Sequence, residues 1–295
     1  METSVAPSPA VRAAFSRLID YAGLFPPAEL SMSQAREEYL QARAGPYAWM
    51  LGRFIIPFAS LAGAAQSFAG PFTAIVDASQ VAAVAALRTA GVAIEAVEIP
   101  VADSPDEGAL RVSLQELRAA LDSVGLSELP VYLEFVRLKE TVAIESALSA
   151  AAAARCGAKL RCGGVTAEAF PAIDEVVRFI AAATAARVPF KATAGLHHPV
   201  RHFNAPSGFT MHGFLNILAA AALASQVDLE ILSNVVAEED PKAFRFEDTV
   251  MRWRDREIDV ARLSETRRHG FIGYGSCSFA EPIDDLTALG ILTKR

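Results

Sequence analysis

The sequence is poor in cysteine, with three residues, Cys156, Cys162 and Cys277, among 295. An odd number of cysteines with no C-x-x-C pair argues against a disulfide framework and against a zinc knuckle. Cys277 lies between two serines, and the sequence shows no activating base beside it. We therefore interpret Cys277 as a packing residue.

Long apolar runs and an excess of positive charge are also lacking. The longest apolar stretch, residues 214–227, is interrupted by Asn216, Ser225 and Gln226 and is too short to span a membrane. The first residues show no basic region followed by an apolar run, so no signal peptide is predicted. The net charge of −7 argues against nucleic acid and anionic membranes as partners. We therefore expect a cytoplasmic protein that acts on a small molecule, either alone or as a homo-oligomer.

Lysine is scarce as well, since the chain has five lysines and 22 arginines. A lysine within an apolar strand is therefore more informative here than in an average sequence. Hydrophobic residues make up 52% of the chain and charged residues 21%, which excludes a disordered chain and allows a sizeable core.

Eight apolar, strand-like runs alternate with segments of helical period. The expected strands are 18–24, 49–57, 72–77, 94–99, 131–136, 158–162, 188–193 and 271–276, and the expected helices are 33–43, 79–90, 106–124, 139–155, 167–185 and 211–225. Such alternation predicts a parallel sheet covered by helices. Eight units in one chain of this length favour a single closed α/β fold, the (β/α)8 TIM barrel. The long interval before the last strand predicts a lid or extra helices over residues 198–268.

Alternation within the strands turns several charged side chains into the barrel. Interior positions are predicted for Glu98, Glu134, Lys159, Arg161 and Lys191, for Asp77 at the end of the third strand, and for Asp20 in a similar place on the first. Barrel interiors are normally filled by Val, Ile and Leu, and an unpaired charge there is costly. Because barrel enzymes hold their chemistry at the carboxyl ends of the strands, we predict an active site. An ion-pair network that only fills the barrel is the alternative.

The segment FKATAG carries the most specific signal. Lys191 would lie in an apolar wall beside a second cation, Lys159 or Arg161, which disfavours its ammonium form. A free amine would then be available as a nucleophile or base for Schiff-base chemistry on a carbonyl compound. In the alternative interpretation, Lys191 is simply paired with Glu134 or Glu98.

Residues 157–197, which read GAKLRCGGVTAEAF and then VPFKATAGL, resemble part of the deoxyribose-phosphate aldolase-like class I aldolases. That family carries G-A-x-x-x-K-T-S-T-G on one strand and V-K-A-S-G-G on the next. The resemblance implies a barrel lyase in which Lys191 matches the family's acid-tuning lysine and Glu98 its fourth-strand carboxylate. The family's Schiff-base lysine has no lysine counterpart at the end of this strand, where Arg161 and Cys162 stand, and neither arginine nor cysteine forms an imine. Lys191 is therefore the first candidate for the imine, and Lys159 the second.

Four of the five histidines fall between residues 197 and 212: His197, His198, His202 and His212. They follow the seventh strand directly, which places them at the catalytic end of the barrel. We predict that they act as general acids or bases in proton transfer. The alternatives are a divalent metal held by His197 or His198 together with His212, Glu134 and Asp77, and a purely hydrogen-bonding role in the lid.

Arginines and a serine supply candidates for binding an anionic group. Arg53, Arg161 and Arg201 are suited to a carboxylate or phosphate, and Ser276 precedes the amino end of the last helix. No G-x-G-x-x-G turn is found, and no cofactor is predicted, a divalent metal being the alternative.

The sequence thus favours an aldolase-type lyase for a small anionic carbonyl compound. In this hypothesis Lys191 or Lys159 forms the imine or donates a proton, Glu98 or Glu134 carries protons, and His197 acts beside them. The remaining candidates would bind the substrate: Arg161, Arg53, Asp77, His198, His212 and Ser276. A metal-dependent isomerase or hydrolase and a non-catalytic binding barrel are the two alternatives.

Overall fold

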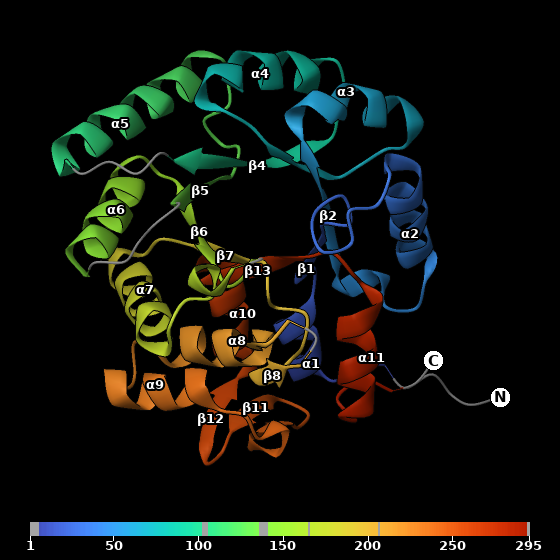
Figure 1. The fold of residues 1–295 in the computed structure, drawn as a ribbon, viewed down its shortest axis with the longest axis vertical. Helices are drawn as coiled ribbons and strands as arrows, with labels where there is room; N and C mark the ends of the chain where they lie inside the picture. Colours follow the sequence, from blue (N-terminus) through green and yellow to red (C-terminus); the bar gives the residue numbers. More distant parts are fainter. Residues whose placement is uncertain (1–5, 102–105, 136–140, 165, 206, 294–295) are drawn as a thin grey trace.

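Eight parallel strands close into a barrel, and helices surround it (Figure 1). The computed structural model describes residues 6–101, 106–135, 141–164, 166–205 and 207–293. The strands pair in sequence order, and the last of them, β13, pairs in parallel with both β7 and β1. The predicted α/β fold, a (β/α)8 TIM barrel, is thereby confirmed.

Each of the eight predicted apolar runs overlaps a barrel strand. The strands are β1 (Ile19–Tyr21), β2 (Leu51–Pro57), β3 (Phe72–Ile75), β4 (Ile94–Val101), β5 (Val131–Phe135), β6 (Gly157–Arg161), β7 (Phe190–Thr193) and β13 (Phe271–Ser276). Their alternate apolar side chains form the core between the barrel and the helices. In β7, for example, Phe190 and Ala192 belong to this core, which leaves Lys191 on the interior side.

The helices surround the barrel, and α8 is buried on all its sides. They are α1 (Pro9–Phe15), α2 (Met32–Ala44), α3 (Phe58–Ser67), α4 (Val81–Thr89), α5 (Glu107–Ser123), α6 (Thr141–Ala153), α7 (Ile173–Ala186), α8 (Phe214–Leu223), α9 (Leu229–Ala237), α10 (Val260–His269) and α11 (Ala280–Ala288). Single 3-10 turns are η1 (Ala48–Met50), η2 (Ala78–Gln80), η3 (Ala167–Ala169) and η4 (Pro241–Ala243). Within the described ranges, no helix is both long and apolar enough to cross a bilayer.

Two helices begin later than predicted. Pro171 interrupts the segment after β6, because a proline inside a helix removes a backbone donor, and α7 starts only at Ile173. Met211 lies in a strand rather than a helix, so α8 starts at Phe214. The helix α3 was not predicted.

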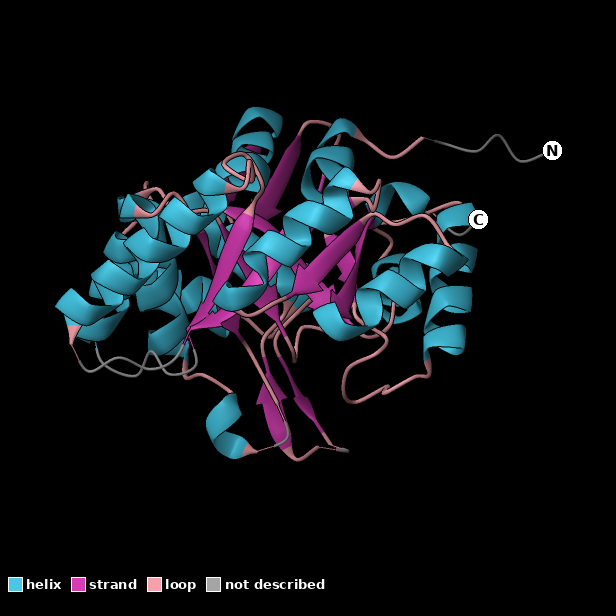
Figure 2. Ribbon diagram, turned by 90° about the horizontal axis from the view of Figure 1, so that it is seen from above, coloured by secondary structure: helices cyan, strands magenta, loops and turns pink. Residues whose placement is uncertain are grey.

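Residues 198–268 form extra elements, but only the first of them extends over the end of the barrel. A hairpin of β8 (His202–Asn204) and β9 (Phe209–Met211) projects beyond the barrel strands (Figure 2). The antiparallel sheet of β10 (Phe244–Phe246), β11 (Val250–Trp253) and β12 (Arg256–Asp259) packs instead against α1, where the rings of Phe15 and Phe246 lie 5.2 Å apart. Of the lid or extra helices predicted for this segment, the structure shows the helices α8, α9 and α10 together with the hairpin and the sheet.

Arg267 on α10 ties together the chain at the amino ends of β1 and β13. Its guanidinium donates to the carbonyls of Ala14 at 2.9 Å, Ser16 at 3.0 Å and Phe271 at 2.8 Å, and also to Ile272. One side chain thus satisfies several backbone acceptors at once.

Removing this guanidinium should therefore destabilise the barrel. We expect Arg267→Met to lower the free energy of unfolding in urea by about 2–4 kcal/mol, because each carbonyl left without a donor costs about 1–3 kcal/mol when it is desolvated. The neighbouring Arg268 is exposed, and Arg268→Met serves as the control, expected within about 0.5 kcal/mol of the wild type. Equal effects of the two substitutions would contradict this role of Arg267.

Candidate active site

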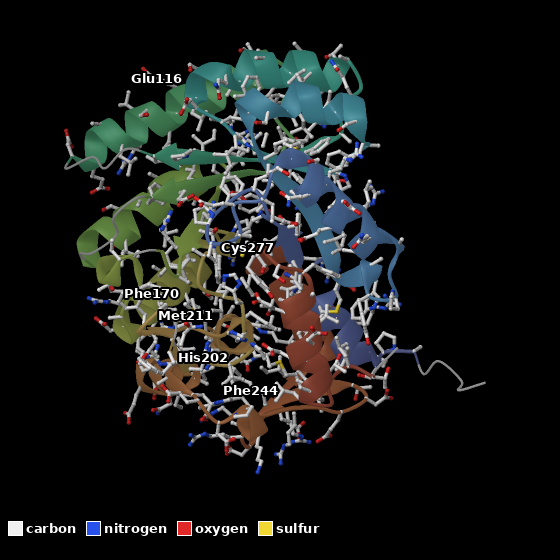
Figure 3. All side chains as sticks on the ribbon, turned by 45° about the vertical axis from the view of Figure 1, so that its right-hand side comes forward. Glu116, Phe170, His202, Met211, Phe244 and Cys277 are labelled. Atoms are coloured by element: carbon white, nitrogen blue, oxygen red, sulfur yellow. The ribbon has the colours of Figure 1, made fainter. Side chains whose placement is uncertain are left out.

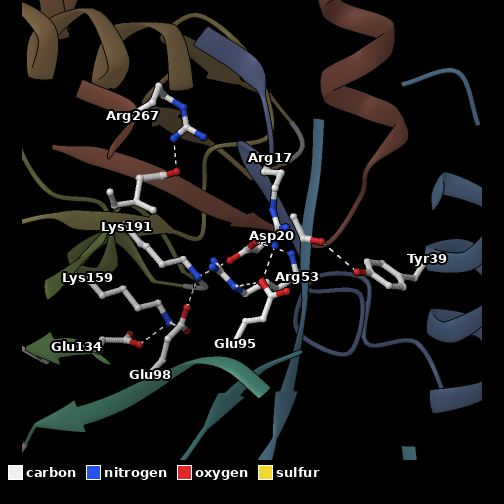
Figure 4. A network of polar contacts seen from close by, with 12 residues as sticks. Arg17, Asp20, Tyr39, Arg53, Glu95, Glu98, Glu134, Lys159, Lys191 and Arg267 are labelled. Carbon is white, nitrogen blue, oxygen red and sulfur yellow. Dashed lines mark hydrogen bonds and ion pairs between the residues drawn. The ribbon is translucent and has the colours of Figure 1, made fainter. Parts of the chain in front are cut away.

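Six charged side chains form a continuous row inside the barrel, with acids and bases alternating. Five strands supply them, and β6 supplies two. Along the row they are Asp20, Lys191, Glu98, Lys159, Glu134 and Arg161, of which Figure 4 shows the first five. We call these six residues the charged row.

Each carboxylate of the charged row is held close to its bases. Lys191 Nζ lies 2.6 Å from both Asp20 Oδ2 and Glu98 Oε1. Lys159 Nζ lies 2.7 Å from Glu98 Oε2 and 2.8 Å from Glu134 Oε2. The row ends in a contact of 3.1 Å between Glu134 Oε1 and Arg161 Nη1. Each of the two lysines in the charged row therefore lies between two carboxylates.

The strand register brings these side chains together. Glu134 is the register partner of Lys159, and Lys159 is the partner of Lys191. Space for the row comes in part from glycine, since a Cβ at Gly52 would overlap Asp20 Oδ1. The backbone N–H of Arg53 donates to that same oxygen at 2.7 Å, which holds Asp20 in place.

Exposure is low from Asp20, at 4%, to Glu98, and rises from there to Arg161. The side chains of Lys191 and Glu98 are 1% exposed, that of Lys159 is 6%, that of Glu134 15% and that of Arg161 51%. Arg161 is the last residue of β6, so the row opens at the carboxyl ends of the strands. We call this end the barrel mouth. A molecule that enters there meets Arg161 first and reaches Lys159 before Lys191.

Electrostatics keep both lysines charged. Burial lowers the pKa of Lys191, but the carboxylates of Asp20 and Glu98 outweigh burial and raise it above its ordinary value. The pKa of Lys159 is raised in the same way by Glu98 and Glu134. Burial raises the pKa of Glu98, yet the two ammonium groups lower it to about 2. The predicted loss of a proton from Lys191 is therefore wrong for this arrangement, because two anions, and not a cation, are its nearest neighbours.

Tyr132 was missed by the sequence prediction, although it lies in the same interior. Lys191 Nζ lies 5.5 Å from the centre of the Tyr132 ring, a distance at which the ring face attracts a cation. Tyr132 lies two residues before Glu134 on β5, so strand alternation alone would have placed it on the interior face.

Arg53 and Asp77 are not members of the charged row. The guanidinium of Arg53 pairs at 3.1 Å with Glu95, at the start of β4, and Glu95 also pairs with Arg17, just before β1. This cluster belongs to the amino ends of the strands, opposite the barrel mouth. Asp77 follows β3 and is exposed, and its backbone N–H donates to Gln80 at 2.9 Å.

His212 and Ser276 have their polar atoms engaged within the protein. His212 Nε2 lies 2.8 Å from the carbonyl oxygen of Pro171, and its Nδ1 lies 3.5 Å from the guanidinium of Arg201. Burial lowers the pKa of His212 to about 4, so the ring is neutral. The Ser276 hydroxyl donates to the carbonyl of Ser278 at 2.6 Å. Both residues stabilise loops in this structure, and their role in substrate binding remains a prediction.

His197 and His198 lie at the barrel mouth, as predicted. His197 Nδ1 lies 3.1 Å from Glu281, and His198 Nδ1 lies 2.6 Å from Asp285. The two acids are four residues apart on α11 and therefore face the same side of that helix. The two pairs tie the loop after β7 to α11. A catalytic role for either histidine remains a prediction.

The predicted metal ligands are not brought together. In the part of the chain that the structure describes, no three His, Cys, Asp or Glu side chains are grouped around a point where a metal ion would fit. Of the proposed set His197, His212 and Glu134, the first pairs with Glu281, the second with backbone and Arg201, and the third with Lys159 and Arg161.

The fold and the charged row together define a (β/α)8 barrel with a charged interior that opens at the usual catalytic end. Neither the family models nor the curated proteins that were searched include a match to this chain. The function must therefore be inferred from the geometry.

The lowered pKa of Glu98 predicts a loss of stability in acid. A glutamate whose pKa is lower in the folded protein than in the unfolded chain stabilises the folded state at any pH above its unfolded pKa of about 4.3. This stabilisation is lost as the pH falls from the unfolded pKa to the folded pKa. We expect the free energy of unfolding to fall between about pH 4.3 and the folded pKa of about 2, and Glu98→Gln to reduce that slope.

Urea unfolding at a series of pH values measures this slope. The control is Glu116→Gln, since Glu116 is an exposed carboxylate on α5 (Figure 3). It should retain the wild-type slope. Identical slopes for the wild type and Glu98→Gln would show that Glu98 does not have a depressed pKa.

Proposed function

We propose that this protein is an aldolase-type lyase that acts on a small carbonyl compound with an anionic group, through an imine on Lys159. The observation that carries the proposal is the order of the charged row at the barrel mouth. Arg161 is half exposed, Glu134 lies behind it and Lys159 behind Glu134. An anion-binding group, a proton carrier and an amine thus follow one another along the path of entry.

Arg161 is suited to bind the anionic group of the substrate. Its Nε donates to the Gly163 carbonyl at 3.1 Å and its Nη1 contacts Glu134, and its side chain is 51% exposed, so a substrate anion can reach the guanidinium. Guanidinium groups bind carboxylates and phosphates by paired hydrogen bonds. A substrate anion at this position would compete with Glu134 for Arg161.

This competition supplies a route to the free amine. When the substrate anion takes over Arg161, Glu134 loses its cationic neighbour at the mouth and becomes a better proton acceptor for Lys159, 2.8 Å away. The neutral amine then adds to the substrate carbonyl carbon. The carbonyl oxygen leaves as water, with one proton from the amine and the other returned by Glu134, and an iminium ion remains.

Glu98 and Lys191 would act behind the reacting lysine. Glu98 contacts both ammonium groups, so it continues to balance one positive charge while Lys159 carries the iminium ion. The iminium ion withdraws electrons from the neighbouring carbon–carbon bond, which can then break or form. Glu134 is the proton carrier closest to the mouth for this step. The resemblance of residues 157–197 to class I aldolases supports the same reaction class.

The order of the two lysines differs from the one expected from sequence. Lys191 was the first candidate for the imine because it matches the family strand more closely. Its side chain is the less exposed of the two and is held between two buried carboxylates. We therefore assign the imine to Lys159 and a charge-balancing role to Lys191.

A binding barrel without chemistry is the second candidate. It is favoured by one observation, namely that every charge of the row already has an opposite charge beside it. A row of fully paired charges is equally consistent with the single role of filling the barrel interior.

Borohydride trapping distinguishes these candidates. We expect incubation with pyruvate, glyoxylate or glycolaldehyde and then borohydride to add the mass of a reduced imine, and peptide mapping to place it on Lys159. Lys159→Met should abolish the adduct, whereas Lys242→Met, at an exposed position, should not. An adduct on Lys191 would contradict our assignment, and the absence of any adduct on the folded protein would favour the binding barrel.

Arg161 should control the preference for anionic substrates. We expect Arg161→Met to slow trapping of pyruvate by about 10- to 100-fold, since a hydrogen bond to a charged group contributes about 1.5–3 kcal/mol. Trapping of uncharged propanal should be unchanged or faster. A similar loss with both compounds would mean that Arg161 acts through Glu134 or the fold and not through the substrate anion.

A further inference from the structure

A thiol, an imidazole and a carboxylate follow one another at the barrel mouth, outside the charged row. Cys277 Sγ lies 4.0 Å from both Nδ1 and Nε2 of His197. His197 Nδ1 in turn lies 3.1 Å from Glu281 Oε2. The sequence showed no base beside Cys277 because His197 lies 80 residues earlier in the chain.

The barrel topology brings these three residues together. Cys277 directly follows β13, and His197 lies in the loop after β7, its neighbour in the barrel. Because the two strands are parallel, their carboxyl ends lie at the same end of the barrel. Glu281 comes from the first turn of α11, which follows the same strand. Figure 3 labels Cys277 near the middle of the molecule, inside the ring of helices.

The three cysteines differ in their surroundings. Cys156 contacts the carbonyl of Ala154 and the guanidinium of Arg118, and Cys162 is fully buried. Burial raises the pKa of Cys162 to about 12. Cys277 is 9% exposed, the largest exposed fraction among the three cysteines. Among the described residues, its sulfur is also the only one of the three that contacts an imidazole. The other two cysteines therefore serve as internal references.

We propose that Cys277, His197 and Glu281 form a second reactive site, which binds small uncharged aldehydes reversibly as hemithioacetals. A thiol beside an imidazole that is oriented by a carboxylate is the arrangement that activates a cysteine nucleophile. The negative charges of Glu281 and Asp285 at this rim disfavour an anionic electrophile, which is the reason for choosing an uncharged one.

The addition is balanced in atoms and electrons. The thiol proton passes to His197, and Glu281 stabilises the imidazolium ion. The thiolate sulfur forms a bond to the aldehyde carbon, and the electron pair of the carbonyl bond moves to oxygen. That oxygen takes the proton back from His197, so no group leaves and nothing is oxidised or reduced.

The polar surroundings of the sulfur fit this transfer. Burial raises the pKa of the Cys277 thiol, so the sulfur stays protonated until a base removes the proton. A hydrogen bond with the backbone of Ala28 acts in the opposite direction and lowers the pKa of the same thiol. The carboxylates of Glu38 and Glu281 raise it further. Reactivity at neutral pH therefore depends on His197.

Alkylation of the native protein with iodoacetamide, mapped by peptide mass, tests the site independently of any lysine chemistry. We expect Cys277 to react at least about tenfold faster than Cys156 and Cys162, and His197→Gln to slow it by at least about tenfold. Glu281→Gln should slow it several-fold. Asp284→Asn removes the same charge from an exposed position of the same helix and should leave the rate unchanged.

Either of two results would overturn the proposal. One is that Cys277 is alkylated no faster than Cys162, and the other is that His197→Gln leaves the alkylation rate of Cys277 unchanged. If His197→Gln unfolds the protein, Cys156 and Cys162 become reactive. Glu281→Gln then decides, because its side chain is 52% exposed and the fold tolerates its loss. Propanal should slow alkylation of Cys277, and 1-propanol should not. No protection by propanal would rule out the aldehyde as the ligand.

Discussion

The balance of buried charge is the constraint on which the interior of this barrel depends. An ionised group taken out of water costs several kcal/mol unless opposite charges and hydrogen bonds replace the solvent. Lys191 and Glu98 are nearly inaccessible, and each is balanced on both sides by neighbours in the charged row. No interior member can be removed without leaving a neighbour uncompensated. The alternation of acids and bases therefore has to continue until it reaches solvent at Arg161.

This constraint also connects the fold to the proposed chemistry. Both lysines are held as ammonium ions in the resting protein, so an amine at Lys159 becomes available only when the outer end of the row is disturbed. Arg161 is the member that a substrate reaches. An anionic group that binds it changes the charge balance at Glu134 and then at Lys159. Reactivity is thereby coupled to binding of the substrate and is absent without it.

The sequence predicted the barrel and the interior side chains because both depend on local alternation. In β7 and β4 every second residue is apolar, which is enough to place Lys191 and Glu98 inside. Alternation does not predict which side chains meet across the barrel, and the sign of the Lys191 pKa shift depends on that pairing. It also does not show toward which end of a strand a side chain reaches, and Arg53 on β2 reaches toward the amino ends, where it pairs with Glu95. The contact of Cys277 with His197 joins two loops far apart in sequence and has no local signal.

The account's central claim is that both interior lysines remain charged because of the charged row. NMR of the protein labelled in its lysine side chains measures this directly, since the chain contains only five lysines. As the pH is raised, an ordinary lysine side chain in water titrates near pH 10.4. The signals assigned to Lys159 and Lys191 by Lys→Arg substitution should stay in the ammonium form beyond that pH. Titration of either of them below about pH 10 would contradict the account.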